Sequence, residues 1–146
     1  MIAGPVVVDA SVVVEYLVDL GRTRATDRLF GALVDADRNL ELWAPDLVYA
    51  ECASALRKLV ARKAVPATAG GRAIDQLRRL PLRVTGTRSL LREMWSLRGR
   101  LTSYDACYLA LARRLDVPLV TADEKLARAT RGVRVLLLEE LDSSQR

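Results

Sequence analysis

Five short apolar runs recur along the chain, and each is separated from the next by a segment with the periodicity of a helix. The run Val6–Val8 is entirely β-branched and stops at an acid, which is typical of a strand buried on both faces. Strands that alternate with helices indicate parallel βαβ units, so the sequence predicts an α/β fold with a mostly parallel sheet. The predicted strands are 5–8, 40–44, 82–85, 117–121 and 133–138.

Seven helices are predicted between these strands, and side chains that can cap a helix mark several of their starts. We expect Ser11, Asp46 and Ser103 to act as N-caps, because each stands before a segment with helical apolar periodicity. No repeat, low-complexity stretch or linker interrupts the chain, so we expect residues 1–146 to form a single domain. The predicted helices are 11–20, 23–36, 46–63, 67–80, 88–98, 103–115 and 123–129.

Two acids follow directly on predicted strands. Asp9 ends the first apolar run, and Asp123 comes two residues after the fourth. Ligands of open parallel sheets bind beyond the carboxyl ends of the strands, which is where these two carboxylates are expected to lie. Each also has a purely structural interpretation, since Asp9 suits a turn and Asp123 suits a helix cap.

Two further acids fall on helix faces that should be apolar. Glu51 lies three residues after Val48, and Asp105 lies three residues before Tyr108, so both share the inward stripe of their helices. A carboxylate on a core face is costly unless it is paired or bound to a metal. Taken alone, Glu51 is also compatible with an Arg partner, and Asp105 with the dipole of its helix. Four such acids together favour a shared site.

Histidine is absent from the chain. This excludes Ser-His-Asp and Cys-His nucleophiles and the usual zinc sites, and leaves carboxylates, hydroxyls, Lys or Arg, with a hard metal, to carry any catalysis. Cys52 and Cys107 lie within apolar helical patterns and are predicted to be buried thiols, not a disulfide. We find no signal-peptide pattern and no run of about 18 apolar residues, so we expect a cytoplasmic protein without a membrane span.

The positive charge is concentrated in one part of the chain. Residues 57–100 contain twelve Lys and Arg against two acids, whereas the remainder contains eleven basic and sixteen acidic residues. This asymmetry favours a polyanion-facing region beside an acidic pocket. The alternative is a solvated basic face, since 20 of the 23 basic residues are Arg and the bias can reflect codon usage.

Four segments carry a resemblance to the PIN-domain family, in the family's order and over residues 6–135. Val6–Ser11 resembles its opening strand, which ends in Asp followed by a small residue and Ser or Thr. Tyr49–Leu56 is similar to the helix with its acidic residue, although Ser54 stands where the family often has Asn. Ser103–Ala112 and Pro118–Leu126 resemble its third and fourth motifs, which are specific when they occur in tandem.

The resemblance implies a three-layer fold and an acidic pocket for Mg²⁺ or Mn²⁺, ions that prefer oxygen ligands. It implies that Asp9, Asp105 and Asp123 are metal ligands, and that Glu51 is a ligand through water or orients the attacking water. These four acids are therefore the candidate catalytic and metal-binding residues. Ser11 and Thr121 become candidates for orienting the ligands, with local backbone capping as the alternative.

The resemblance also implies a function. PIN domains of this length are commonly VapC-type toxins of type II toxin–antitoxin pairs, so we expect a metal-dependent endoribonuclease that leaves a 5′-phosphate and a 3′-hydroxyl. The expected partners are an RNA substrate, a second copy in a homodimer, and a VapB-type antitoxin whose Arg or Lys reaches the carboxylates.

Other functions compete with this prediction. A phosphatase with a strand-end Asp nucleophile generally needs a second acid two residues on, where this chain has Ser11. A phospho-accepting receiver domain places its acceptor on a middle strand, whereas Asp9 ends the first. A non-catalytic PIN-like binding module would be expected to have lost ligands, yet all four acids are present.

Overall fold

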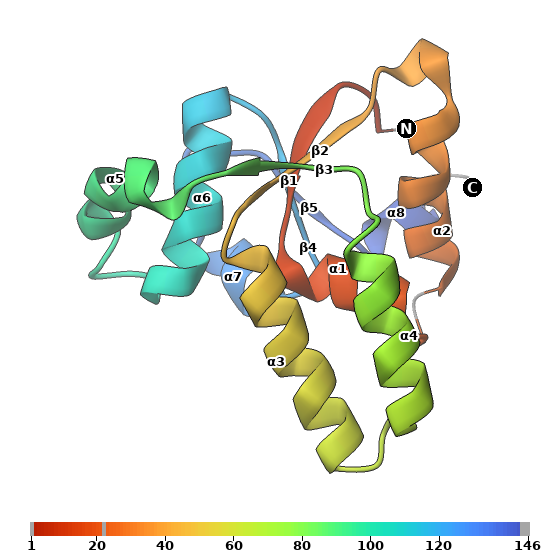
Figure 1. Cartoon of the computed structure of the whole chain (residues 1–146). Coiled ribbons are helices and arrows are strands. Elements are labelled where there is room, and N and C mark those ends of the chain that lie inside the picture. The colour runs from red at the N-terminus through yellow and green to blue at the C-terminus, as the bar shows by residue number, and fades with distance from the viewer. Residues whose placement is uncertain (1, 22, 144–146) are drawn as a thin grey trace.

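Parallel strands form the centre of the computed structural model, which describes residues 2–21 and 23–143. Five strands are hydrogen-bonded in the order β3-β2-β1-β4-β5, and every pair is parallel (Figure 1). This confirms the predicted sheet, with strand ends that differ from the expected ones by no more than two residues. The strands are β1 (Pro5–Val8), β2 (Glu41–Pro45), β3 (Leu82–Thr85), β4 (Leu119–Thr121) and β5 (Val135–Leu137).

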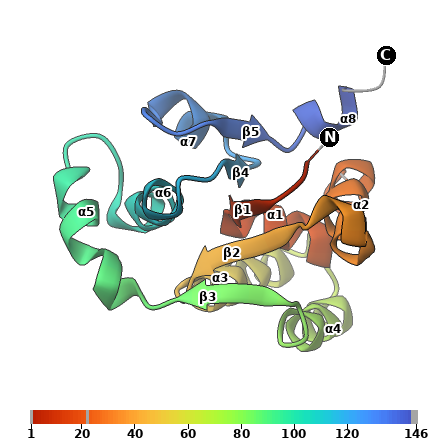
Figure 2. The same cartoon turned by 90° about the horizontal axis from the view of Figure 1, so that it is seen from above.

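Helices cover both faces of this sheet. Figure 2 shows α5 and α6 on one side and α1, α2 and α4 on the other, which makes three layers. β1 lies in the middle of the sheet, so Val6, Val7 and Val8 are fully buried, as their unbroken apolar run predicts. The helices are α1 (Ala10–Leu17), α2 (Thr23–Gly31), α3 (Val48–Ala61), α4 (Ala67–Leu77), α5 (Leu91–Ser96), α6 (Ser103–Leu115), α7 (Glu124–Ala129) and α8 (Glu140–Ser143).

All three predicted N-caps are wrong, because other residues take the role or the side chain is used elsewhere. Asp46 does not cap α3, which begins at Val48; its carboxylate accepts hydrogen bonds from the backbone N–H and the hydroxyl of Thr87. The cap of α6 is Thr102, whose hydroxyl accepts from the backbone N–H of Asp105 at 3.2 Å. Thr87 is distant from Asp46 in sequence, so no local pattern indicates this contact.

The first two helices also differ from their predicted extents. α1 begins at Ala10, so Asp9 and not Ser11 occupies the N-cap position. α2 ends at Gly31, and two 3₁₀ turns follow where the sequence predicted a continuous helix to residue 36. The short helix α8 was not predicted. Cys52 and Cys107 are buried free thiols, as expected.

Helices α3 and α4 pack side by side and project beyond the sheet (Figure 1). Their contact is close at Gly70, where an added Cβ would lie 2.8 Å from Val60 Cγ2. Gly71, the next residue of α4, would have nothing within 4 Å of an added Cβ. Substitution of these two neighbouring glycines by alanine therefore distinguishes the effect of packing on stability from the effect of helix propensity.

Gly70→Ala is expected to destabilise the protein by about 1 kcal/mol, because the clash with a stiff β-branched side chain costs about 1–3 kcal/mol and the helix gains about 1 kcal/mol. Gly71→Ala should instead stabilise it by about 0.5–1 kcal/mol. Urea unfolding of both variants measures the difference. Equal stabilisation by the two substitutions would contradict the close packing of α4 on α3.

None of the helices within residues 2–21 and 23–143 is both long enough and apolar enough to cross a membrane.

Candidate active site

The carboxyl ends of β1 and β4 bring Asp9 and Thr121 side by side. Val8 is paired with Val120, so the next residue of each strand meets its neighbour at the same edge of the sheet. The backbone N–H of Asp9 donates to the carbonyl of Val120 at 3.0 Å and continues the ladder to this point. The position of Asp9 at the strand end, predicted from sequence, is confirmed.

Two hydroxyl groups fix the Asp9 carboxylate. Ser11 Oγ donates to Asp9 Oδ2 at 2.7 Å, and Thr121 Oγ1 donates to the same oxygen at 2.9 Å. The same hydroxyls accept from the backbone, Ser11 from the N–H of Ala122 and Thr121 from the N–H of Asp123, both at 3.0 Å. Thr121 therefore serves both functions considered for it, since it orients a carboxylate and satisfies local backbone. Ser11 orients the carboxylate, but the backbone N–H that it satisfies is distant in sequence.

Burial makes this carboxylate unusual. Asp9 is 7% exposed, and desolvation raises its pKa, with a smaller contribution in the same direction from the charge of Asp105. The hydrogen bonds from Ser11 and Thr121 act in the opposite direction, because they stabilise the ionised form. The two hydroxyls therefore fix the orientation of the carboxylate, while burial has the larger effect on its pKa.

Helices α3 and α6 supply the next two acids. Glu51 lies in the first turn of α3 and Asp105 in the first turn of α6, and both side chains are partly buried. Burial is the largest cause that raises the pKa of each. The charges of Asp9 and Asp105 raise the pKa of Glu51 further, and the charge of Asp123 does the same to Asp105. Asp9, Glu51 and Asp105 therefore lie within electrostatic range of one another, and Asp123 lies within range of Asp105.

Glu51 carries a buried oxygen that the fold does not satisfy. Its Oε1 has no hydrogen-bond partner among the described residues, and neither has the buried hydroxyl of Tyr108. The nearby Tyr108 hydroxyl lowers the pKa of Glu51, against the effect of burial, although the two groups do not complete a hydrogen bond of normal geometry. An unpaired carboxylate oxygen in a protein interior costs free energy, so such an atom indicates a ligand or an ordered water.

Sequence reasoning did not assign Tyr108 a role. The spacing of three from Asp105 identified it only as part of the inward apolar stripe. Its hydroxyl was the available signal, because a buried Tyr usually needs a polar partner.

Asp123 has the structural role that the sequence allowed. Its Oδ1 accepts from the backbone N–H groups of Lys125 and Leu126 at 2.8 and 3.3 Å, which caps α7. Capping occupies one carboxylate oxygen and leaves the charge of Asp123 near Asp105. Asp123 can therefore cap the helix and contribute to the acidic cluster.

The donor set fits a hard, hydrated cation. Within the described residues, no three Asp, Glu or Cys side chains are arranged so that they could ligate one ion directly. Mg²⁺ keeps several of its waters and uses one or two carboxylates, so a cluster of mutually repelling acids with an orphaned oxygen suits it through mixed direct and water-mediated contacts. The chemistry available at this edge is the binding of a divalent ion and of water.

Ser11→Ala is expected to destabilise the protein by about 1–2 kcal/mol, since it removes one donor from Asp9 and leaves the N–H of Ala122 without its acceptor. Ser96→Ala is the matched control, because that hydroxyl only bonds the carbonyl of Glu93 on an exposed helix, and it should change stability by less than about 0.5 kcal/mol. Urea unfolding compares them. Equal effects would show that the hydroxyl of Ser11 does not support the site.

Known proteins resemble this chain over most of its length. The model of the PIN domain family matches residues 6–132. Ribonuclease VapC9 of Mycobacterium tuberculosis is 38% identical over 122 residues, which cover 84% of this chain and 88% of the relative. Ribonuclease VapC1 of the same organism is 39% identical over 124 residues, covering 84% and 89%.

Solved structures share the fold. The crystal structure of VapBC2 from Rickettsia felis, bound to a DNA fragment from their promoter, superposes with a TM-score of 0.66 at 12% identity and covers 91% of this chain and 98% of that one. At this identity the superposition concerns the arrangement of helices and strands alone. The family match and the relatives in sequence agree with it, and the chain belongs to the PIN domain family, within the group of the VapC ribonucleases.

Proposed function

We propose that this protein is a metal-dependent endoribonuclease and the toxin of a toxin–antitoxin pair. One observation supports this most: Asp9 is buried at the end of β1, held by two hydroxyls, among three other acids at the edge where parallel sheets bind ligands. The relatives named as ribonucleases align over 84% of the chain. An acid cluster without histidine agrees with hydrolysis by a metal-activated water.

We assign the four acids distinct tasks in this reaction. Asp9, Asp105 and Asp123 would hold Mg²⁺ or Mn²⁺ through a mixture of direct and water-mediated contacts, and the ion when bound lowers the pKa of water and neutralises charge on the scissile phosphate. Glu51 would hold the ion through water, or its unpartnered Oε1 would accept a hydrogen bond from the attacking water and orient it. Ser11 and Thr121 keep Asp9 in one orientation, so the site needs little reorganisation when substrate binds.

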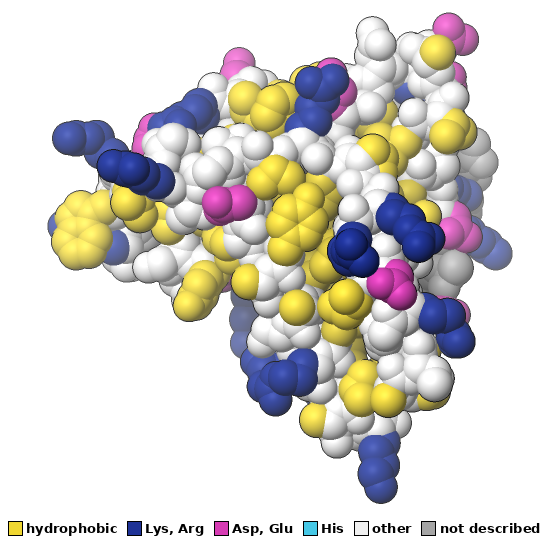
Figure 3. All heavy atoms as spheres, in the orientation of Figure 1, with side chains coloured by type: hydrophobic (Ala, Val, Ile, Leu, Met, Phe, Trp, Pro, Cys, Tyr) yellow, Lys and Arg dark blue, Asp and Glu magenta, His cyan; other side chains and the backbone are white. Residues whose placement is uncertain are grey.

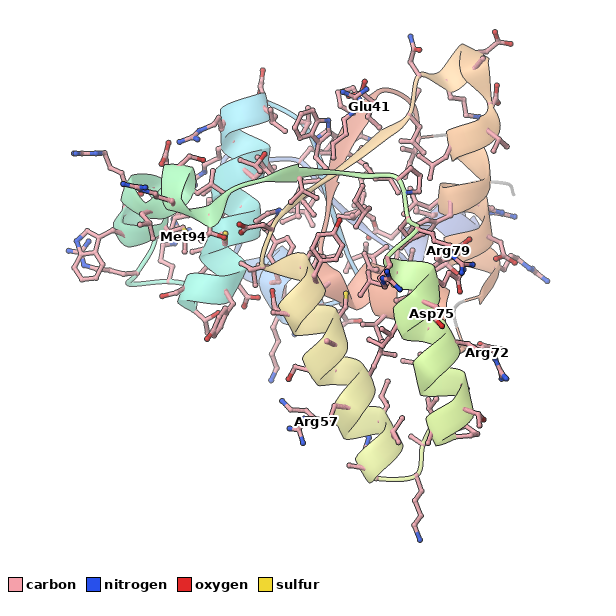
Figure 4. The ribbon with its side chains drawn as sticks, in the orientation of Figure 1. Glu41, Arg57, Arg72, Asp75, Arg79 and Met94 are labelled. Carbon is pink, nitrogen blue, oxygen red and sulfur yellow. The ribbon has the colours of Figure 1, made fainter. Side chains whose placement is uncertain are left out.

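The basic stretch would hold the RNA. All twelve Lys and Arg between residues 57 and 100 are exposed, and Figure 3 shows such side chains around α5 and along α3 and α4. Arg57 and Arg72 point outward from α3 and α4 in Figure 4. Contacts of this kind fix the position of a phosphate backbone without reading its sequence.

The proposed partners follow from the relatives. A VapB-type antitoxin would neutralise the enzyme, and two copies of the chain would form the active homodimer; both are proposals for this protein. The site of action would be the cytoplasm, where cellular RNA and such an antitoxin meet.

Purified protein incubated with total cellular RNA tests the activity. Cleavage with Mg²⁺ or Mn²⁺, its loss in EDTA and 5′-phosphate ends on the products are the expected results. Absence of cleavage with either ion, together with trapping of an acyl phosphate, would instead identify the phosphatase. Absence of both reactions would leave the non-catalytic binding module.

A further inference from the structure

The two tryptophans of the chain lie in contrasting environments. Trp43 in β2 is partly buried, and its Nε1 donates to Glu41 at 3.0 Å. Trp95 in α5 is 68% exposed, although a large aromatic side chain stabilises a fold mainly by being buried. Trp43 therefore contributes to the stability of the fold, whereas most of the Trp95 side chain remains in solvent and contributes little to it.

An arginine lies over each indole ring, but only one of the two arginines is paired with an acid. The Arg83 guanidinium over Trp43, at 5.7 Å from the ring centroid, pairs with Glu41 at 3.2 Å. The Arg98 guanidinium lies at 4.8 Å over Trp95, donates to the carbonyl of Trp95 at 3.0 Å and forms no ion pair with a described residue. Trp95 thus presents an exposed ring with an uncompensated positive charge fixed beside it.

The surroundings of Trp95 are basic. The segment 88–100 around it also contains Arg88, Arg92 and Arg100, which are all exposed. The single acid of this segment, Glu93, is paired with Arg114 at 2.7 Å. Arginine around an exposed aromatic ring is the combination that binds single-stranded nucleic acid, because phosphates meet the guanidinium groups and a base stacks on the ring.

The acidic cluster lies at the end of the helix on which α5 packs. Met94, which points from α5 toward α6 in Figure 4, packs against Ala106 and Leu109 of α6. The side chain next to Asp105 is Tyr104, which is 65% exposed. A second exposed aromatic ring therefore lies in the first turn of α6, beside one of the four acids.

We propose that Trp95 is a binding site for a base of the RNA substrate, stacked on the indole ring while Arg98 and its neighbours contact the flanking phosphates. This proposal rests on the proposed function, because it assigns the site to the substrate of the same enzyme. Trp95 binds and positions the substrate and takes no part in the chemical step.

Tryptophan fluorescence provides the test. In the variant W43F/D9N, Trp95 is the only tryptophan and RNA is not expected to be cleaved. An unstructured oligouridylate or oligoadenylate of about a dozen nucleotides, added in EDTA, should quench its emission in a saturable way, because stacked bases quench indole. The matched variant W95Y/D9N keeps only Trp43 and should show almost no quenching.

Binding and cleavage by variants of Trp95 provide the second readout. W95L should weaken oligonucleotide binding about 5- to 150-fold, which corresponds to the loss of one stacked base, whereas W95Y should retain most of the affinity. In the chain with Asp9 intact, W95L should raise KM and leave kcat nearly unchanged. If W43F fails to fold, the difference in quenching between the parent and W95Y gives the same information.

The outcomes separate this proposal from the proposed function. An unquenched Trp95, with W95L binding and cleaving RNA as the parent does, would overturn the stacking site while the nuclease stands. A parent that binds RNA at Trp95 but never cleaves it would overturn the nuclease alone. Dissociation of a dimer by W95L, with RNA affinity unchanged, would assign this face to a protein contact and would also overturn the proposal.

Discussion

Asp9→Asn is expected to reduce RNA cleavage by at least about a hundredfold, since a metal ion supplies several kcal/mol of transition-state stabilisation and each 1.4 kcal/mol is a factor of ten in rate. The variant should fold normally. Asn retains one oxygen that can accept the hydrogen bonds of Ser11 and Thr121, which both go to Oδ2 in the structure. Initial rates of cleavage with saturating Mn²⁺, beside circular dichroism, measure the two effects.

Asp75→Asn is the matched control for this substitution. Asp75 lies on α4 with its side chain 62% exposed, and its contact with Arg78 is a long one of 3.8 Å. Cleavage by this variant should equal that of the parent. Undiminished cleavage by Asp9→Asn, or cleavage by the parent in EDTA, would refute the metal mechanism.

Divalent metal is expected to raise the Tm by about 5–10 °C at a hundred times its Kd, because ligand binding at that concentration adds about 2.7 kcal/mol and each kcal/mol shifts a chain of this size by about 2–4 °C. The effect should be larger at pH 7.5 than at pH 4.5. Burial, together with neighbouring carboxylates, raises the pKa of Asp9, Glu51 and Asp105. Protons therefore compete with the metal at low pH.

The sign of the metal-free pH dependence follows from the same shifts. Because the folded protein holds these protons more tightly than the unfolded chain does, their contribution to stability is complete below the ordinary pKa values and is lost as the pH rises through the raised ones. Asp9→Asn should therefore be more stable than the parent near neutral pH without metal, and metal should shift its Tm little. Differential scanning fluorimetry across pH, with and without Mn²⁺, checks this. Equal shifts in both proteins would place the metal elsewhere.

Local sequence patterns determined much of this fold. The β-branched run Val6–Val8 could be satisfied only in a strand buried on both faces, and its place in the middle of the sheet agrees with that. The residue after such a strand must lie at the carboxyl edge, so the location of Asp9 followed from its position in the chain. The inward spacing of Glu51 and Asp105 likewise followed from helix geometry.

Only the tertiary structure decided which groups meet. Thr121 donates to Asp9, which lies 112 positions away in the sequence. Asp46 does not cap a helix as predicted, and its carboxylate instead accepts from Thr87, which lies 41 positions away. Such contacts depend on strand order and helix packing, which are long-range properties that periodicity over a few turns does not contain. Sequence could therefore predict which acids face inward, whereas the hydroxyls that orient Asp9, the unsatisfied oxygen of Glu51 and the exposed ring of Trp95 required the assembled chain.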